Sequence, residues 1–162
     1  MSYSSLMQNS TFAVSVVMQR RELRNRWQSE AWEPVAVLPE AGEGAPRVCH
    51  EEPGVRQWVH PGMQLQLRVA DADGYFLNVS TAEPCVFVLW RMAGELAVPC
   101  HLTVSYSEAS SWMDGGEQVD RVPMPRPIYD WVSEFVQRHY RPQPKKKIRP
   151  QSFKSPKDRA RI

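Results

Sequence analysis

Apolar and polar residues alternate at every second position in several stretches of the chain, and this period constrains the fold more than any other feature. The segment MQLQLRV at 63–69 alternates strictly, with Met63, Leu65, Leu67 and Val69 on one face. An earlier stretch likewise places four apolar side chains on one face: Phe12, Val14, Val16 and Met18. Successive side chains of a strand point to opposite faces, so each stretch predicts a β-strand with one inward face. CVFVLW at 85–90 is apolar on both faces, which predicts a strand covered by the sheet interior and by a helix.

Turn signals divide these strands. RRELRNR at 20–26 predicts a polar hairpin, His60-Pro61-Gly62 predicts a turn, and Asp73-Gly74 predicts a second hairpin. In the last alternating stretch the inward set is Leu96, Val98, Cys100, Leu102 and Val104, while Pro99 within it indicates an edge strand or a bulge. The count is about seven strands. Short connections between them predict an antiparallel β-meander that curls into a partial barrel.

Helical periodicity appears only near the end of the chain. Ser105 or Ser107 is a candidate N-cap for a short helix that runs to Met113. A longer helix is predicted over 127–140, with Pro127 in its first turn and an apolar stripe made of Ile128, Trp131, Val132, Phe135, Val136 and His139. We expect this helix to lie across the sheet and to bury Trp131 and Phe135. The predicted fold class is therefore α+β.

Length and composition predict one domain with a tail. With 162 residues, of which 42% are hydrophobic, the chain is long enough to bury one core. We expect a flexible N-terminus over 1–11, a β-rich domain over 12–141 and an extended tail over 142–162. No apolar run is long enough for a membrane span, the N-terminus has no signal-peptide pattern, and three cysteines without CxxC spacing favour a cytoplasmic location.

Charge is divided unequally between the domain and the tail. Residues 141–162 carry nine basic residues and one acid, a net charge of +8, whereas residues 1–140 carry 11 arginines and 17 acids, a net charge of −6. Prolines prevent the tail from forming a long helix. We interpret it as a disordered basic arm, centred on Lys145, Lys146, Lys147 and Arg149, that docks on an acidic protein surface. A solubilising role remains an alternative, as does binding to nucleic acid or anionic lipid.

The stretch WMDGGEQVDRVPMP at 112–125 is predicted to be the connection between the two helices. Its three carboxylates do not have the spacing of a calcium loop, and neighbours in one loop do not readily flank a cleft as glycosidase carboxylates do. A metal or catalytic use remains an alternative. We interpret the stretch as solvated turn residues or as a partner-binding loop made of Asp114, Gly115, Gly116, Glu117, Asp120 and Met124.

Two Cys-His pairs, Cys49-His50 and Cys100-His101, raise a zinc hypothesis together with Cys85. Adjacent residues of a strand point to opposite faces, so Cys100 and His101 are not expected to bind the same ion. No cysteine has a helix N-terminus or basic neighbours that would lower the pKa of its thiol. No phosphate loop, GxGxxG, GxSxG or HExxH motif is present. We therefore predict no catalytic residues and no metal site.

Four arginines in the first hairpin form the strongest candidate for anion binding: Arg20, Arg21, Arg24 and Arg26. Guanidinium groups hold phosphate or carboxylate through paired hydrogen bonds, so the cluster is a candidate site for a phosphate-bearing cofactor. The alternative is a solvated loop whose charge is balanced by Glu22 and the acidic domain.

Four blocks of the sequence together resemble an uncharacterised bacterial family, a domain of unknown function. The blocks are RWQSEAWEPVAVLP, FLNVSTAEPCVFVLWRM, VSYSEASSWMDGGEQVDRVPMP and HYRPQPKKKIRP. The genes of this family commonly lie beside those of molybdenum-dependent formate dehydrogenases and their maturation factors. The resemblance implies a non-enzymatic role in formate dehydrogenase assembly or molybdenum-cofactor maturation. It transfers no active-site residue.

Three hypotheses follow for the function. The first is an adaptor or chaperone that binds a formate dehydrogenase subunit or a maturation factor. The second is a phosphate- or pterin-binding module that uses the arginines of 20–26. Molybdopterin is a candidate ligand of this module. The third is an unrecognised enzyme or zinc protein that uses Cys49, His50 or the carboxylates of 114–120.

Overall fold

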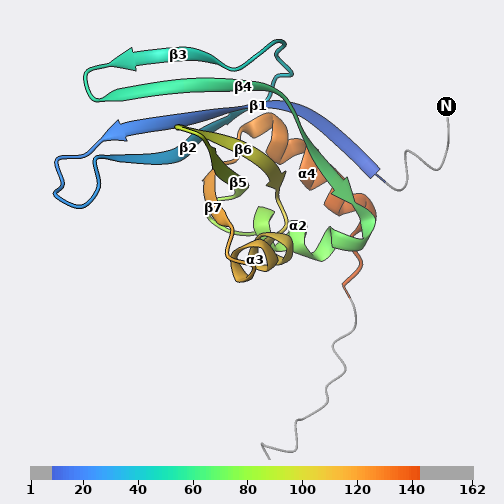
Figure 1. Ribbon diagram of the computed structural model, residues 1–162. Coiled ribbons are helices and arrows are strands. Elements are labelled where there is room, and N and C mark those ends of the chain that lie inside the picture. The colour runs from blue at the N-terminus through green and yellow to red at the C-terminus, as the bar shows by residue number, and fades with distance from the viewer. Residues whose placement is uncertain (1–8, 143–162) are drawn as a thin grey trace, which may run out of the picture.

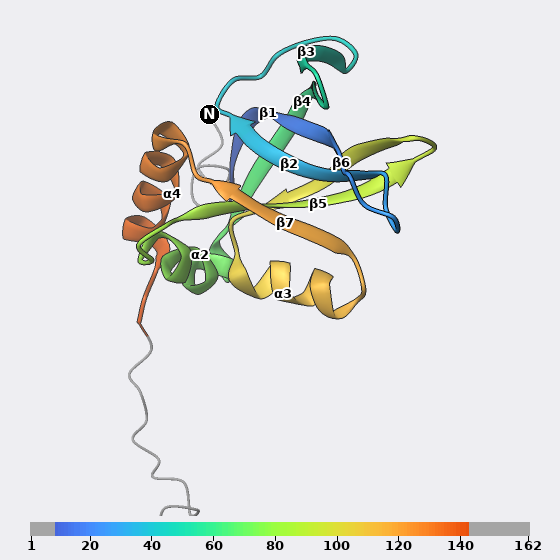
Figure 2. The ribbon, with the colours of Figure 1, turned by 90° about the vertical axis from the view of Figure 1, so that its left-hand side faces the viewer.

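The computed structural model describes residues 9–142, which form two antiparallel β-sheets and three α-helices (Figures 1 and 2). The strands are β1 (Asn9–Glu22), β2 (Glu30–Leu38), β3 (Arg47–Glu52), β4 (Val55–Arg68), β5 (Cys85–Ala93), β6 (Leu96–Thr103) and β7 (Gln118–Pro123). The helices are α2 (Ala72–Val79), α3 (Tyr106–Asp114) and α4 (Arg126–His139), and a 3-10 helix, η1 (Val69–Asp71), precedes α2. The predicted α+β class is confirmed, and the described residues contain the expected seven strands. Predictions for residues 1–8 and 143–162 lie outside the described part of the chain.

The larger sheet has four strands in the order β2-β1-β4-β3, with β1 and β4 as its long central pair. The face of β1 predicted to point inward does so: Val14, Val16 and Met18 are fully buried, and Phe12 packs against the same core. The core lies beneath this face, which is covered at one end by the smaller sheet and at the other by α4 (Figure 2).

β4 continues through Pro61 and Gly62, where the sequence predicted a turn. The prediction was wrong because these residues form a bulge instead of reversing the chain. Val16 pairs with His60 and Val14 with Met63, so the partner strand skips one residue while β4 skips two, and Gly62 adopts a φ of 76°. The bulge also changes which side chains face inward, and after it the odd-numbered residues Leu65 and Leu67 are buried as predicted.

The smaller sheet has three strands in the order β6-β5-β7. All six residues of CVFVLW in β5 are buried, which confirms the expectation of a strand covered on both faces. Val86, Val88 and Trp90 face the main core, whereas Cys85 and Phe87 join a second, smaller core with Ala109 of α3. The sheet interior and a helix are thus the two layers that cover β5.

β6 is an edge strand and also has a bulge, so both readings of Pro99 are confirmed. Trp90 pairs with Pro99 and Leu89 with His101, which leaves Cys100 as the extra residue. Before the bulge Ala97 and Pro99 are buried and Leu96 is exposed, contrary to the predicted phase. After the bulge the prediction holds, because Leu102 packs against the core and Val104 belongs to it.

The two predicted helices are present with the expected ends. Ser105 caps α3 through its hydroxyl, which accepts the N–H of Glu108 at 3.3 Å, and Gly115-Gly116 ends the helix. α4 carries Pro127 in its first turn and buries Phe135 with three other apolar residues. Trp131 is only partly buried. Its ring lies 5.2 Å from that of Phe12, and its indole N–H donates to the Ser10 hydroxyl at 2.7 Å.

Asp73-Gly74 does not form the predicted hairpin, because both residues lie in α2. Gly74 is buried, and a Cβ on it would lie 2.5 Å from the Ser105 hydroxyl oxygen. Glycine is therefore needed here for close approach of α2 to the cap of α3, not for a turn.

Two further features differ from the predicted meander. β1 pairs with β4, which lies far away in the sequence, and the strands form two separate sheets, so the predicted partial barrel is not confirmed. The predicted connection at 112–125 contains β7, which pairs with β5 along its length. Strand formation there satisfies main-chain groups that would otherwise border the exposed side of β5.

Candidate functional site

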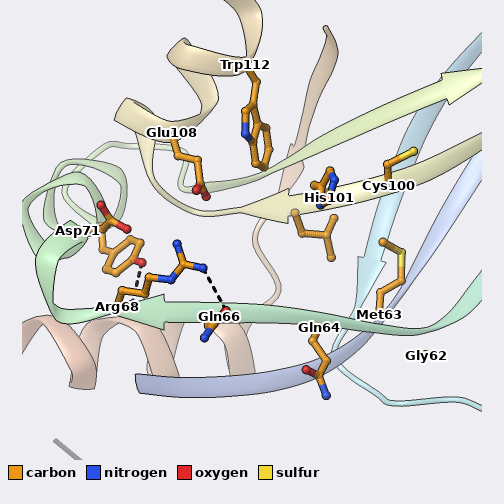
Figure 3. A pocket seen from close by; sticks show the side chains of 12 residues that line it. Gly62, Met63, Gln64, Gln66, Arg68, Asp71, Cys100, His101, Glu108 and Trp112 are labelled. Atoms are coloured by element: carbon orange, nitrogen blue, oxygen red, sulfur yellow. Dashed lines mark hydrogen bonds between the residues drawn. The ribbon is translucent and has the colours of Figure 1, made fainter. Parts of the chain in front are cut away.

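The candidate site is a cleft of about 380 Å³ beside β4 and β6, roofed by α3 (Figure 3). Five structural elements supply its walls: the second half of β4, the middle of β6, η1, α2 and α3. Its lining is mainly polar and includes Gln64, Gln66, Arg68, Asp71, Tyr75, Cys100, His101, Glu108 and Trp112.

Local structure explains how each wall presents these groups. After the bulge at Gly62 the even-numbered residues of β4 point away from the core, so Arg68 lies on the outside of the sheet. Glu108 and Trp112 are four residues apart in α3 and therefore share one face of the helix. The bulge in β6 turns His101 away from the main core, and its ring lies 6.2 Å from that of Trp112.

Tyr75 closes one end of the cleft. Its hydroxyl oxygen accepts the main-chain N–H of Arg68 at 2.9 Å, and its ring meets that of Phe135 edge-on at 5.8 Å. Burial raises the pKa of Tyr75 to about 12, and the negative charges of Asp71 and Glu108 contribute in the same direction. The phenol is therefore neutral at physiological pH, when its hydroxyl can both accept and donate.

The charged side chains of the cleft have no ion-pair partner within residues 9–142. Arg68, Asp71 and Glu108 form no salt bridge, and the guanidinium group of Arg68 makes only a 3.4 Å hydrogen bond to Gln66. Figure 3 shows Arg68 and Glu108 directed toward one another from opposite walls. A ligand with charged groups could enter between them and form charge-assisted hydrogen bonds with both.

The four arginines predicted to bind an anion are not gathered in one place. Arg20 and Arg21 are consecutive residues of β1 and therefore point to opposite faces, while Arg24 and Arg26 lie in the following loop. Arg20 lies 3.7 Å from Glu30, and Arg26 packs over Trp27. The phosphate-binding hypothesis thus receives no support from the arrangement and stays a prediction.

Two of the three acidic residues of 112–125 have partners within the fold. Glu117 accepts two hydrogen bonds from Arg91 of β5, at 3.0 and 2.7 Å, and Asp120 accepts the indole N–H of Trp90 at 2.7 Å. The Arg91 hydrogen bonds lower the pKa of Glu117 and raise that of Arg91. Met124 packs against the main core and donates its main-chain N–H to the carbonyl of Pro84. Only Asp114, at the end of α3, and the exposed Gly115-Gly116 remain as an outward-facing turn.

The cysteines and histidines of the zinc hypothesis lie on different elements. Cys49 is exposed on β3, Cys85 is buried in the smaller core, and Cys100 bulges from β6. Burial raises the pKa of the Cys85 thiol, which keeps it protonated. Among residues 9–142, no three His, Cys, Asp or Glu side chains gather closely enough to hold a metal ion.

The basic arm of Lys145, Lys146, Lys147 and Arg149 lies outside the described residues. Within the described part, none of the helices combines the length and hydrophobicity needed to traverse a bilayer.

None of the charged groups of the cleft was among the predicted site residues. His101 was considered only as a zinc ligand, and Arg68, Asp71, Glu108 and Trp112 are spread over 45 positions without a local motif. The sequence offered one signal of the cleft: the glutamines and the arginine of MQLQLRV alternate with its apolar residues and so were expected to point outward. An ordinary solvated strand face has the same pattern.

Comparison with known proteins bears on the family but not on the chemistry of the cleft. A search of curated proteins and a search of solved structures each gave no significant match. The family model described as "Protein of unknown function (DUF3305)" matches residues 13–149, which is most of the chain. The protein therefore belongs to the DUF3305 family of proteins of unknown function.

Proposed function

We propose that this protein is a non-enzymatic accessory protein that acts by binding another protein. The observation that carries the proposal is the cleft. Positively and negatively charged side chains and an indole ring line it together, and the charged groups form no salt bridge with each other. Charged groups that are left unpaired next to aromatic surface are suited to recognition of a polypeptide, which supplies charge, hydrogen bonds and apolar contact together.

A second surface supports the same kind of function. The outward side of α2 exposes Phe76 and Leu77, of which 39% and 55% of the residue surface is accessible. The ring of Phe76 lies 4.2 Å from that of Tyr140, the residue that follows α4. The basic segment of the chain begins directly after Tyr140. An apolar patch at Tyr140, which a basic stretch of sequence follows, fits a protein surface that combines apolar and acidic residues.

The identity of the partner is part of the proposal and comes from the resemblance between the four sequence blocks and the family described above. It implies a subunit of a molybdenum-dependent formate dehydrogenase, or one of its maturation factors, as the binding partner. In this proposal the protein holds a subunit during assembly or cofactor insertion in the cytoplasm, and makes no covalent change itself.

Co-purification tests the proposal. The full-length chain would be tagged and isolated from a strain that expresses a formate dehydrogenase, and retained proteins would be identified by mass spectrometry. We expect a dehydrogenase subunit or a maturation factor to be retained. The variants Arg68→Gln and Glu108→Gln should lose it, whereas Arg126→Gln, an exposed arginine of α4 paired with Asp130, is the matched control and should retain it.

Deletion of the gene supplies the second half of the test. Formate dehydrogenase activity should fall in the deletion strain and return when the full-length chain is supplied again. Unchanged activity after deletion, together with recovery of the chain without either kind of partner, would count decisively against the proposal.

A further inference from the structure

One edge of β4 borders the cleft and is not paired along its second half. β1 pairs with β4 as far as Arg68, but on the other side β3 pairs with β4 only up to Val59. The residues of β4 that follow the bulge therefore have a strand on one side only, and Gln64 and Gln66 of this stretch line the cleft.

One hydrogen bond identifies the main-chain groups that point to this free edge. Arg68 donates its N–H to the Tyr75 hydroxyl at 2.9 Å, and this acceptor does not belong to β1. Main-chain groups of a strand point alternately to its two edges, so the even-numbered residues Gln64 and Gln66 direct their N–H and C=O groups to the same free edge.

The edge is thus closed at Arg68 by Tyr75 and open at Gln64 and Gln66. Within residues 9–142, no loop, helix or side chain gives a hydrogen bond to the main chain of Gln64 or Gln66 on that side. Four main-chain groups remain available, which is the number that an added strand of about four or five residues would use. Proteins commonly cover or charge such edges. Here β6 and α3 form the facing walls of the cleft, but among residues 9–142 no strand pairs with this stretch of the edge.

We propose that this edge accepts an extended peptide of a partner protein, which adds to β4 as a short strand and places an arginine or lysine between Asp71 and Glu108. The two carboxylates outnumber the one guanidinium group of the cleft and have no partner of their own among the described residues. Trp112 on α3 offers a flat surface for the stem of such a side chain. Main-chain pairing provides affinity in this mode of binding, and the side-chain contacts provide specificity.

This inference rests on the proposed function, since it names the surface and the kind of segment through which the partner is bound.

The probe is a pool of capped seven-residue peptides with a central arginine or lysine flanked by valine and threonine. Titration into the isotopically labelled full-length chain, followed by NMR, should shift the amide signals of Gln64 and Gln66 and slow their hydrogen exchange. A pool with central glutamate should bind at least tenfold more weakly.

Two matched controls separate main-chain pairing from side-chain contact. Gln66→Pro removes an N–H that has no partner in the fold, so the variant should remain folded yet bind at least tenfold more weakly. Gln66→Ala keeps the N–H and should bind within about twofold of the natural chain. Peptides that are N-methylated at the central positions should lose binding as well. Circular dichroism and urea unfolding confirm that both variants are folded.

Several outcomes would overturn the inference. Equal binding by the proline and alanine variants would exclude pairing along this edge, as would equal binding by the N-methylated peptides. The inference would also fail if millimolar concentrations of the peptide pool shifted no amide signal of Gln64 or Gln66. A capped peptide of residues 143–150 serves as a further probe, and tighter binding by it than by the pool would identify the chain's own tail as the occupant. Retention of the cellular partner by Gln66→Pro would refute the edge but leave the accessory function standing.

Discussion

Replacement of Asn78 by alanine tests whether a single side chain fixes α2, and with it one end of the cleft, to the smaller sheet. Asn78 is 0% exposed. Its amide nitrogen donates to the carbonyls of Cys85 and Val104 at 2.7 and 2.8 Å, and its amide oxygen accepts the N–H of Cys85 at 3.0 Å. One side chain thus provides hydrogen-bond partners for main-chain groups at the start of β5 and directly after β6. Alanine removes all three bonds and leaves the three main-chain groups buried.

The expected loss of stability follows from these contacts. A buried hydrogen bond contributes about 1 kcal/mol net, and a main-chain group left without its partner costs about 1–3 kcal/mol. Water that enters the space left by the amide can satisfy some of the groups, so we expect the free energy of unfolding to fall by about 3 kcal/mol. For a domain of this size the loss corresponds to a decrease in Tm of roughly 10 °C.

Urea unfolding, followed by far-ultraviolet circular dichroism and by tryptophan fluorescence, measures the change. The matched control is Asn25→Ala, because Asn25 also accepts a main-chain N–H, that of Trp27 at 2.8 Å, but does so at the surface. Its expected effect is within about 0.5 kcal/mol. A loss below about 1 kcal/mol for Asn78→Ala, with an unchanged denaturant slope, would refute the view that α2 is held by these three bonds.

Three more predictions concern the surroundings of the cleft. Gly74→Ala should lower the free energy of unfolding by about 1–3 kcal/mol because its Cβ would meet the Ser105 hydroxyl, and the loss should shrink when Ser105 is also changed to glycine; a double-mutant cycle measures this. The raised pKa of Tyr75 means that its contribution to stability is complete below pH 10 and is lost as the pH rises toward 12, so unfolding curves of Tyr75→Phe should lack that loss. Burial lowers the pKa of His60 from 6.5, so its contribution is present above pH 6.5 and is lost as the pH falls below that value; His60→Gln should flatten this part of the stability profile, and an unchanged profile would contradict the assignment.

The strands could be predicted because their period is a property of neighbouring residues. CVFVLW indicated a strand covered on both faces, and the structure buries it between the two cores. The cap of α3 at Ser105 and the Pro127 start of α4 were likewise readable from short patterns. Each of these features depends on residues that lie within about a dozen positions of one another.

The errors arose where distant contacts decide the conformation. Asp73-Gly74 has the composition of a hairpin, but Ser105, about 30 positions away, needs the space that glycine leaves in a helix. The segment that forms β7 looks like a linker because its pairing partner is β5. Its acids looked available for metal or partner binding, although Trp90 and Arg91 occupy Asp120 and Glu117. Single-sequence patterns contain no information on such pairs.

The cleft itself depends on two of the four places where strand alternation breaks. Without the bulge at Gly62, the inward phase of Trp58 and His60 would continue along β4 and turn Gln64 and Gln66 into the core. Without the bulge at Cys100, the inward phase of Ala97 and Pro99 would carry His101 into the core in the same way.

Each bulge therefore moves polar groups from the interior to the cleft while it keeps an apolar face on the core. Bulges interrupt a ladder, and the described strands contain four register shifts. Those at Gly62 and Cys100 lie on the strands that border the cleft, whereas those in β2 and β3 lie elsewhere. The two bulges beside the cleft explain why strict alternation was a good guide to the fold and a poor guide to the site.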